Sequence, residues 1–218
     1  MGEKIIRRPI SARNSKWAGV IARSLANAGF RPNHISVLSV VFAACSGACF
    51  VGSSSVHSVA GKITLFLCAA FFIQLRLLCN LFDGMVAVEG GFRTKSGEIF
   101  NDFPDRLADP LILVAVGYST SSFSFGSALG WLAGLLAVMT AYVRVLGGSC
   151  GAKQDFRGPM AKQHRMAIVT VASVLAALEV FCGWPARILL LALVVVVLGC
   201  VVTVIRRVCG IIAELESK

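Results

Sequence analysis

Long apolar stretches separated by short polar segments dominate the chain. Charged residues are absent from positions 35–61, 110–143 and 188–205. A helix needs roughly 20 apolar residues to cross the hydrocarbon core of a membrane, so the second of these stretches can hold two helices. The pattern predicts an all-α, polytopic membrane protein. Its six transmembrane helices are expected at residues 34–55, 62–84, 98–119, 126–147, 164–184 and 186–207.

A shorter amphipathic segment precedes the first of these helices. In residues 15–29, Trp17, Ile21 and Leu25 recur at helical spacing, while Arg23 falls on another face. A helix with this pattern lies in the membrane interface, with its tryptophan at the depth of the lipid headgroups. We therefore expect an N-terminal interfacial helix that does not cross the membrane.

The composition agrees with a single membrane domain over residues 1–218. The chain is 56% hydrophobic and only 15% charged, which is too apolar for an ordinary soluble domain. No internal repeat or second domain is evident in the sequence. We expect an amphipathic segment at 1–33, a six-helix bundle at 34–207 and a short tail at 208–218.

Positive charge is distributed unevenly along the chain. The net charge is +10, and lysines and arginines gather before the first predicted helix, after the second and fourth, and after the last. The loops on the opposite side contain only Lys62 and Arg187. The positive-inside rule then places both termini in the cytoplasm, at a bacterial-type inner or cell membrane. Topology and anionic membrane lipids account for this basic excess, so nucleic acid is not expected as a partner.

Acidic residues gather at the ends of the second and third predicted helices. Asp83 ends the second helix, and Asp105 and Asp109 lie near the start of the third. A carboxylate is costly inside a membrane, so such a residue is more often functional than incidental. Asn80 shares a helix face with Asp83, and Asn101 shares one with the two later aspartates. A short glycine-containing hairpin joins the two faces, which are expected to form one site on the cytoplasmic side.

The spacing of these residues resembles the signature of the CDP-alcohol phosphatidyltransferase family. That signature is Asp, two residues, Asp-Gly, two residues, Ala-Arg, eight residues, Gly, three residues, Asp, three residues and Asp. In one ungapped frame the chain matches it at Asp83, Gly84, Ala87, Gly97 and Asp105. It departs from the signature at Asn80, Val88 and Asn101, where the pattern has Asp, Arg and Asp.

The resemblance implies a fold and an activity. Members of this family are six-span bundles with an interfacial helix, often homodimers. They transfer a substituted phosphate from a CDP-linked donor such as CDP-diacylglycerol to an alcohol acceptor, with release of CMP, in phospholipid biosynthesis. Divalent Mg²⁺ or Mn²⁺ neutralises the donor pyrophosphate, and a carboxylate takes the proton of the hydroxyl. The acceptor alcohol has no motif that the sequence shows.

The resemblance also implies roles for individual residues. Asp83 is expected to bind the metal and Asp105 to act as general base. The metal ligands expected in this frame are Asn80, Asp83, Asn101 and Asp105, and the residues that leave room for the nucleotide are Gly84, Ala87 and Gly97. The two asparagines offer carbonyl oxygens but remove two negative charges, so the metal is expected to bind more weakly or singly.

A second frame is open for the acids. If the third helix begins near Asp102, with Pro104 in its first turn, Asp105 and Asp109 become the pair spaced by four residues. Asp105 is then the metal ligand and Asp109 the base. Asp105 belongs to the site in both frames.

Several basic residues lie near the same predicted end of the bundle. Arg76, one turn before Asn80, either reaches the membrane boundary or pairs with an acid of the site. Arg144 is expected either to bind phosphate or to form a structural ion pair. The wider set of candidate phosphate- and lipid-binding residues is Arg144, Lys153, Arg157, Lys162 and Arg165. The positive-inside rule alone also explains the charges of the loop between the fourth and fifth predicted helices.

Two other functions compete with transfer. A member of this fold that has lost catalysis would bind nucleotide or lipid without turnover, which the three departures from the signature favour. A small transporter would instead place its charged residues near the bilayer midplane, in broken helices. The acids of this chain gather at one end of the predicted helices, which disfavours transport.

Overall fold

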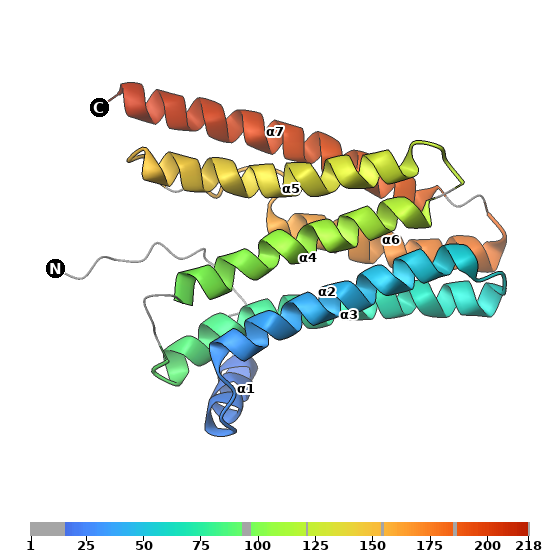
Figure 1. Ribbon diagram of the computed structural model, residues 1–218, viewed down its shortest axis with the longest axis horizontal. Helices are drawn as coiled ribbons and strands as arrows, with labels where there is room; N and C mark the ends of the chain where they lie inside the picture. The colour runs from blue at the N-terminus through green and yellow to red at the C-terminus, as the bar shows by residue number, and fades with distance from the viewer. Residues whose placement is uncertain (1–15, 93–96, 121, 154, 185–186, 218) are drawn as a thin grey trace.

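The protein is a bundle of long helices, seen here in a computed structural model that describes residues 16–92, 97–120, 122–153, 155–184 and 187–217. Helices are the only regular elements in these ranges (Figure 1). They are α1 (Lys16–Asn27), α2 (Pro32–Ser55), α3 (Val59–Glu89), α4 (Gly97–Ser119), α5 (Gly126–Ser149), α6 (Lys162–Cys182) and α7 (Ile188–Glu216).

Helix α4 lies in the middle of the bundle. It packs against α2 on one side and α5 on the other, while α3 packs against α2 and α6, and α7 packs against α5 and α6. In Figure 1 helices α2 to α7 run side by side, and α1 leaves them at a steep angle. The start of α4 therefore lies at the same end of the bundle as the end of α3.

Five helices are long and apolar enough to span a membrane: α2, α3, α5, α6 and α7. Helix α4, expected as the third of the six spans, is not among them because it contains too many charged residues. Its first half contains the charged residues Glu98, Asp102, Asp105, Arg106 and Asp109. Outward-facing apolar side chains such as Leu135, Leu198 and Phe181 are 63%, 61% and 75% exposed. Such a surface suits lipid rather than water.

Helix α1 rests on α3 through small residues. Ala18 and Ala22 are fully buried there, while Trp17 is half exposed and meets the ring of Phe82 edge-on, with 6.3 Å between centroids. The buried alanines lie beside the predicted apolar stripe, of which Trp17 and Ile21 are exposed and Leu25 is partly buried against the bundle. The interfacial position of the helix stays a prediction.

Helix α4 begins where it was predicted, whereas α3 and α7 extend beyond their predicted ends. Helix α4 spans Gly97–Ser119, against the expected 98–119, and includes Pro104, so the alternative start near Asp102 is wrong. Helix α3 continues beyond its predicted end at residue 84 to Glu89. The segment 208–218, predicted as a tail, is helical through Glu216. In α3 and α7 the backbone continues a helix where local polar residues suggested an end.

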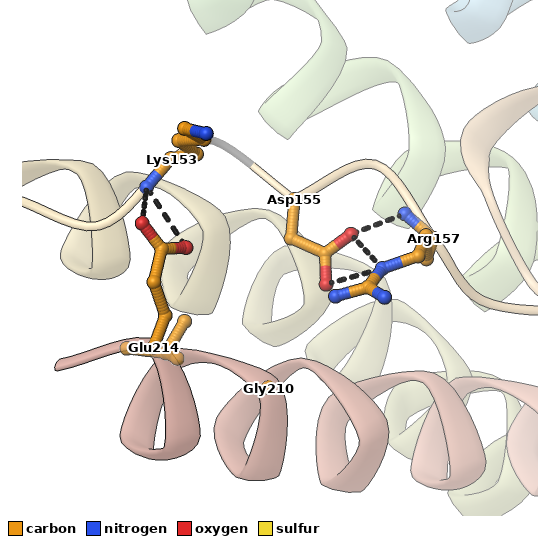
Figure 2. A pocket seen from close by; sticks show the side chains of 6 residues that line it. Lys153, Asp155, Arg157, Gly210 and Glu214 are labelled. Carbon is orange, nitrogen blue, oxygen red and sulfur yellow. Dashed lines mark hydrogen bonds and ion pairs between the residues drawn. The ribbon is translucent and has the colours of Figure 1, made fainter. Parts of the chain in front are cut away.

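The connection between α5 and α6, residues 150–153 and 155–161, is fastened to α7. The amide of Met160 donates to Thr203 Oγ1 over 3.0 Å, and Arg207 Nε donates to the carbonyl of Arg157 over 3.0 Å. Figure 2 shows a further bond near the end of α7, from the amide of Lys153 to Glu214 over 3.0 Å. These bonds fix where α6 begins.

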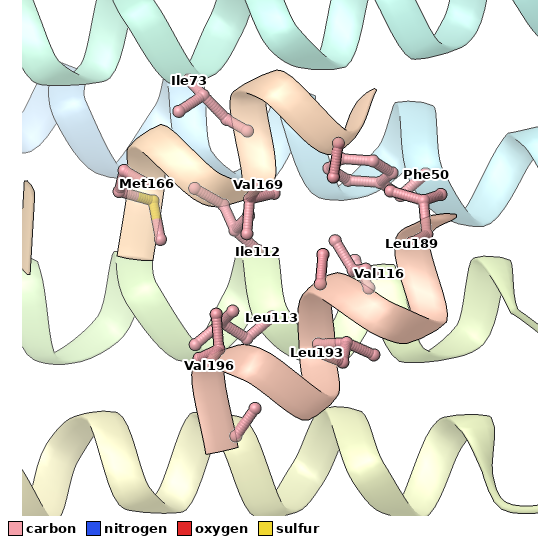
Figure 3. Close-up of a cluster of buried hydrophobic side chains, with 14 of the residues drawn as sticks. Phe50, Ile73, Ile112, Leu113, Val116, Met166, Val169, Leu189, Leu193 and Val196 are labelled. Carbon is pink, nitrogen blue, oxygen red and sulfur yellow. The ribbon is translucent and has the colours of Figure 1, made fainter. Parts of the chain in front are cut away.

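The apolar core is contributed by the six long helices. Side chains of α2, α3, α4, α5, α6 and α7 belong to it, and Figure 3 shows part of it. The members labelled in Figure 3 are Phe50, Ile73, Ile112, Leu113, Val116, Met166, Val169, Leu189, Leu193 and Val196. Inside a membrane, helices associate mainly through van der Waals packing and close approach at small residues. Gly117 of α4 and Gly130 of α5 supply such an approach, because a Cβ on either would lie 2.8 Å from the other's Cα.

Candidate active site

Asp109 lies at the centre of a buried group of charges. Its side chain is 2% exposed, and it is held between two arginines from other helices. Arg76 Nη2 is 2.5 Å from Asp109 Oδ1, and Arg165 Nη2 is 2.7 Å from Oδ2. Arg165 also donates to Thr140 Oγ1 over 3.1 Å and to the carbonyl of Met160 over 2.9 Å. Helices α3, α4, α5 and α6 are thus tied together at this carboxylate.

Arg76 connects Asp105 and Asp109 of α4. Its side chain has no exposed surface, and the same Nη2 atom lies 3.2 Å from Asp105 Oδ1. Nε and Nη1 of this guanidinium find no acceptor among the described residues. Of the two uses expected for Arg76, the structure contains the pairing with acids of the site.

Lys162 completes the group from the start of α6. Its Nζ donates to Asp105 Oδ2, and its side chain remains 21% exposed. Asp105 is 6% exposed. Lys162 is therefore the cation beside Asp105 that solvent or a ligand can reach.

Asp83 lies near these charges but is held by neutral donors. It is 3% exposed, and Ser36 Oγ of α2 donates to its Oδ2 over 2.9 Å. The amide of Gly84 lies 2.5 Å from Oδ1. Lys162 and Asp105 are close enough to act on Asp83 electrostatically. We call the six residues Arg76, Asp83, Asp105, Asp109, Lys162 and Arg165 the charge cluster.

The remaining signature positions are only partly described. Asn80 lies one turn after Arg76, and its Nδ2 is buried without an acceptor in the described part of the chain. The side chain of Asn101 lies outside the described residues. Gly84 and Ala87 are half-buried within α3, and Gly97 begins α4. The predicted nucleotide-binding role of these three stays a prediction.

Arg144 forms an ion pair beside the cluster. Its Nη2 lies 2.9 Å from both carboxylate oxygens of Asp102, and its guanidinium lies 5.2 Å from the centroid of the Phe156 ring. Arg106, four residues after Asp102 on α4, shares that carboxylate over 2.8 Å. Asp102 is therefore occupied by two arginines and does not cap a helix. The ion pair was one of the two expected uses of Arg144.

Lys153 and Arg157 line a separate cleft of about 210 Å³ beside the end of α7, with Gly210 and Glu214 (Figure 2). Arg157 Nε is 3.0 Å from Asp155 Oδ1, and the Arg157 side chain is 81% exposed. Burial alone would raise the pKa of the Asp155 carboxyl, but the hydrogen bonds and charge of Arg157 outweigh it and lower that pKa. Arg157 pairs with an acid of the loop, and the amide of Lys153 bonds to an acid of α7; within the described ranges neither residue bonds to the charge cluster.

Sequence reasoning missed the residues that position the cluster. Ser36 and Thr140 are uncharged and sit in apolar helices, where hydroxyls usually bond to their own backbone. Arg207 is 6% exposed and donates to the carbonyls of Thr140 and Arg157. Its place at the end of an apolar helix made it look like an ordinary positive-inside charge. No sequence signal separates it from the exposed Arg206 beside it.

These elements define a polytopic membrane bundle with a buried charge cluster at one end, the architecture expected from the CDP-alcohol phosphatidyltransferase resemblance. No protein-family model and no curated protein sequence matches the chain. Solved structures of phosphatidylinositol phosphate synthase (PgsA1) from Mycobacterium tuberculosis are similar to it. With CDP-DAG bound, that enzyme aligns with a TM-score of 0.75 and 16% identity over 90% of this chain and 94% of that one.

Two further structures of the same enzyme agree. In complex with manganese and citrate it aligns with a TM-score of 0.73 and 17% identity, over 89% of this chain and 88% of that one. In apo form the values are 0.66 and 18%, over 87% and 93%. At this level of identity the similarity shows a shared fold. The resemblance in the sequence is thus confirmed at the level of the fold.

A neighbour that holds manganese raises the question of whether the acids of this chain fit a divalent metal. Mg²⁺ and Mn²⁺ favour oxygen ligands, carboxylates above all. Both oxygens of Asp83, Asp105 and Asp109 already accept hydrogen bonds from donors of the protein. No group of three His, Cys, Asp or Glu side chains in the described ranges is arranged to hold a metal ion. The acids as folded do not fit a resident divalent metal.

Proposed function

We propose that the chain is a membrane phosphotransferase that moves a substituted phosphate from a CDP-linked lipid, such as CDP-diacylglycerol, to an alcohol. One observation supports this above the others. Asp83 and Asp105, at matching positions of the signature, are buried together at one end of a bundle with the fold of a synthase that binds CDP-DAG. The alcohol, the membrane lipids around the bundle and a homodimeric state belong to the same proposal.

Asp105 is the proposed general base. Its Oδ2 is bonded to Lys162, whose side chain is partly exposed. When a phosphate oxygen of the donor takes over the ammonium of Lys162, Asp105 Oδ2 becomes free to accept the proton of the acceptor hydroxyl. The hydroxyl oxygen then forms a bond to the lipid-bearing phosphorus. The bond from that phosphorus to the CMP oxygen breaks, and CMP leaves with the electron pair.

The other charged residues have positioning and binding roles in this proposal. Asp109, between Arg76 and Arg165, holds α3, α4 and α6 in register around Asp105. In the second frame of the signature, Asp109 was the candidate base, but both of its oxygens are bonded to buried guanidiniums. Lys153 and Arg157 are proposed to attract anionic lipid at the mouth of the bundle. No step of the proposed reaction depends on the Mg²⁺ or Mn²⁺ that the resemblance implies.

A binder without turnover is the second candidate. The ion pairs of Asp105 favour this candidate. Both oxygens of Asp105 are occupied by Arg76 and Lys162, so neither is free to act as a base until Lys162 moves. Transport is not supported, because α3 and α4 run unbroken past the cluster, as Val59–Glu89 and Gly97–Ser119. The apolar surfaces of the helices support a membrane location. The cytoplasmic orientation rests on the positive-inside rule alone.

Replacing Asp105 with asparagine is expected to slow CMP release by about 10²–10⁴-fold, because the proton of the hydroxyl loses its acceptor. Purified protein in lipid vesicles would be given CDP-diacylglycerol with a panel of alcohols, including inositol phosphate, glycerol phosphate and serine. Each reaction would be run with Mg²⁺, with Mn²⁺ and with EDTA. Alcohol-dependent CMP release by the original protein would identify the acceptor.

The matched control is Glu216→Gln, an exposed acid at the end of α7. This variant is expected to release CMP at the original rate. Unchanged release by Asp105→Asn would refute the role of Asp105 as base. Binding of CDP-diacylglycerol without CMP release, over the whole panel, would establish the second candidate instead.

A further inference from the structure

We propose that Arg76 and Lys162 take the place of a divalent metal in this chain, so that its acids are neutralised by the protein itself. The charge cluster contains three aspartates and three cations. Its formal charge is therefore zero with no bound ion. A buried carboxylate needs a compensating positive charge, and in this cluster side chains already supply it.

The positions of the two cations support this proposal. Arg76 Nη2 lies 3.2 Å from Asp105 Oδ1, and Lys162 Nζ bonds to Asp105 Oδ2. Asp105 is the acid expected as metal ligand or base in both frames of the signature. A metal ion could reach its oxygens only by displacing one or both of these cations. Two like-charged groups and a metal ion cannot share one small buried site without strong repulsion.

The sequence changes around Arg76 act in the same direction. Arg76 and Asn80 are one turn apart on α3. Asn80 removes a negative charge from a position where the signature has Asp, while Arg76 adds a positive charge beside it. The Nδ2 of Asn80 and the Nε and Nη1 of Arg76 are buried donors without acceptors in the described ranges. Unused donors suit an anion, such as a phosphate oxygen, and repel a metal ion.

The proposal has a consequence for the ligand, and this part rests on the proposed function. Phosphates of a CDP-linked lipid would be met by Lys162, which is partly exposed, with Arg76 behind it. Affinity for CDP-diacylglycerol is then expected to be the same with Mn²⁺ and with EDTA. A protein that holds its donor through a metal would lose affinity in EDTA.

Binding of Mn²⁺ alone tests the inference directly. The purified full chain in detergent would be titrated with Mn²⁺, and free Mn²⁺ followed by electron paramagnetic resonance. We expect no stoichiometric binding by the original protein. Lys162→Met releases Asp105 Oδ2, and combining it with Asn80→Asp restores the carboxylate of the signature on α3, one turn after Arg76. This double variant is expected to bind Mn²⁺ at least about tenfold more tightly than the original, because attraction replaces repulsion.

Lys62→Met is the matched control, since Lys62 lies in the first turn of α3, 14 residues before Arg76. It is expected to bind no more Mn²⁺ than the original protein. Lys162→Gln, which keeps a hydrogen bond to Asp105, is a second test if Lys162→Met does not fold, and it is expected to gain a weaker Mn²⁺ site. Each variant would be checked by size-exclusion chromatography and circular dichroism.

Two results would overturn the inference. One is stoichiometric Mn²⁺ binding by the original protein. The other is absence of Mn²⁺ binding in every folded variant, which would show that the cations do not occupy the position of a metal. These outcomes are separate from the proposed function. CMP release in EDTA would support both, while metal-dependent release with Mn²⁺ bound to the original protein would refute the inference and leave the transferase standing.

Discussion

Asp109→Asn is expected to destabilise the folded bundle by about 3–5 kcal/mol, the usual cost of removing one partner from a buried ion pair. The carboxylate is 2% exposed and faces both Arg76 and Arg165. Asparagine keeps the shape but leaves two buried guanidiniums without their shared counterion. Thermal unfolding in detergent, followed by circular dichroism, would measure the loss.

The control for this prediction is an acid at the surface. Glu216 ends α7 and is exposed. Because water already solvates such a carboxylate, Glu216→Gln is expected to leave the unfolding temperature nearly unchanged. Equal unfolding temperatures for the two variants would show that the charge cluster does not hold α3, α4 and α6 together.

The acids of the site could be predicted from the sequence for a physical reason. Asp83, Asp105 and Asp109 stand in apolar helices, where an unpaired carboxylate is costly, so their presence required an explanation. Their spacing placed them on two helix faces, and the structure buries all three. Lys162 and Arg165 were also among the predicted residues, although as phosphate ligands. Both residues instead bond to acids of α4. These contacts depend on where α6 begins, which the pattern of apolar and polar residues does not specify.

The partners of these acids could not be predicted. Ser36 and Thr140 meet the cluster from α2 and α5, so their contacts depend on how helices pack. The start of α4 was predicted within one residue, but a later start near Asp102 stayed open because Pro104 removes a backbone donor and resembles a first-turn proline. In a packed membrane bundle, neighbouring groups compensate for a proline inside a helix. The helix therefore continues through Pro104 and Pro110.

The charges of α4 link the fold to the proposed function. The acids that form the cluster are also the reason that α4 lacks the composition of a simple membrane span. Its position between α2 and α5 keeps these acids away from lipid. A helix with this many charges is stable in such a place only if its partners supply counterions. Arg76, Lys162 and Arg165 come from α3 and α6, so the bundle and the site depend on the same contacts.

Gly130→Ala is expected to destabilise the bundle near the upper end of the roughly 1–3 kcal/mol typical of overpacking. A Cβ at Gly130 would lie 2.8 Å from Gly117 Cα and 2.9 Å from the carbonyl oxygen of Leu113. These are backbone atoms of α4, which cannot rotate away as a side chain can. The two helices must move apart, and α4 would shift against α2. Thermal unfolding in detergent would show a lowered unfolding temperature.

Gly19→Ala in α1 is the matched control, because a Cβ at Gly19 meets no atom within 4 Å. Alanine is the better helix former, so this variant is expected to be stabilised by about 0.5–1 kcal/mol if α1 unfolds together with the bundle. The same added methyl group should thus act in opposite directions at the two sites. A neutral or stabilising Gly130→Ala would show that α4 and α5 are not in backbone contact. The position of Asp109 opposite Arg165 would then not depend on close packing of α4 against α5.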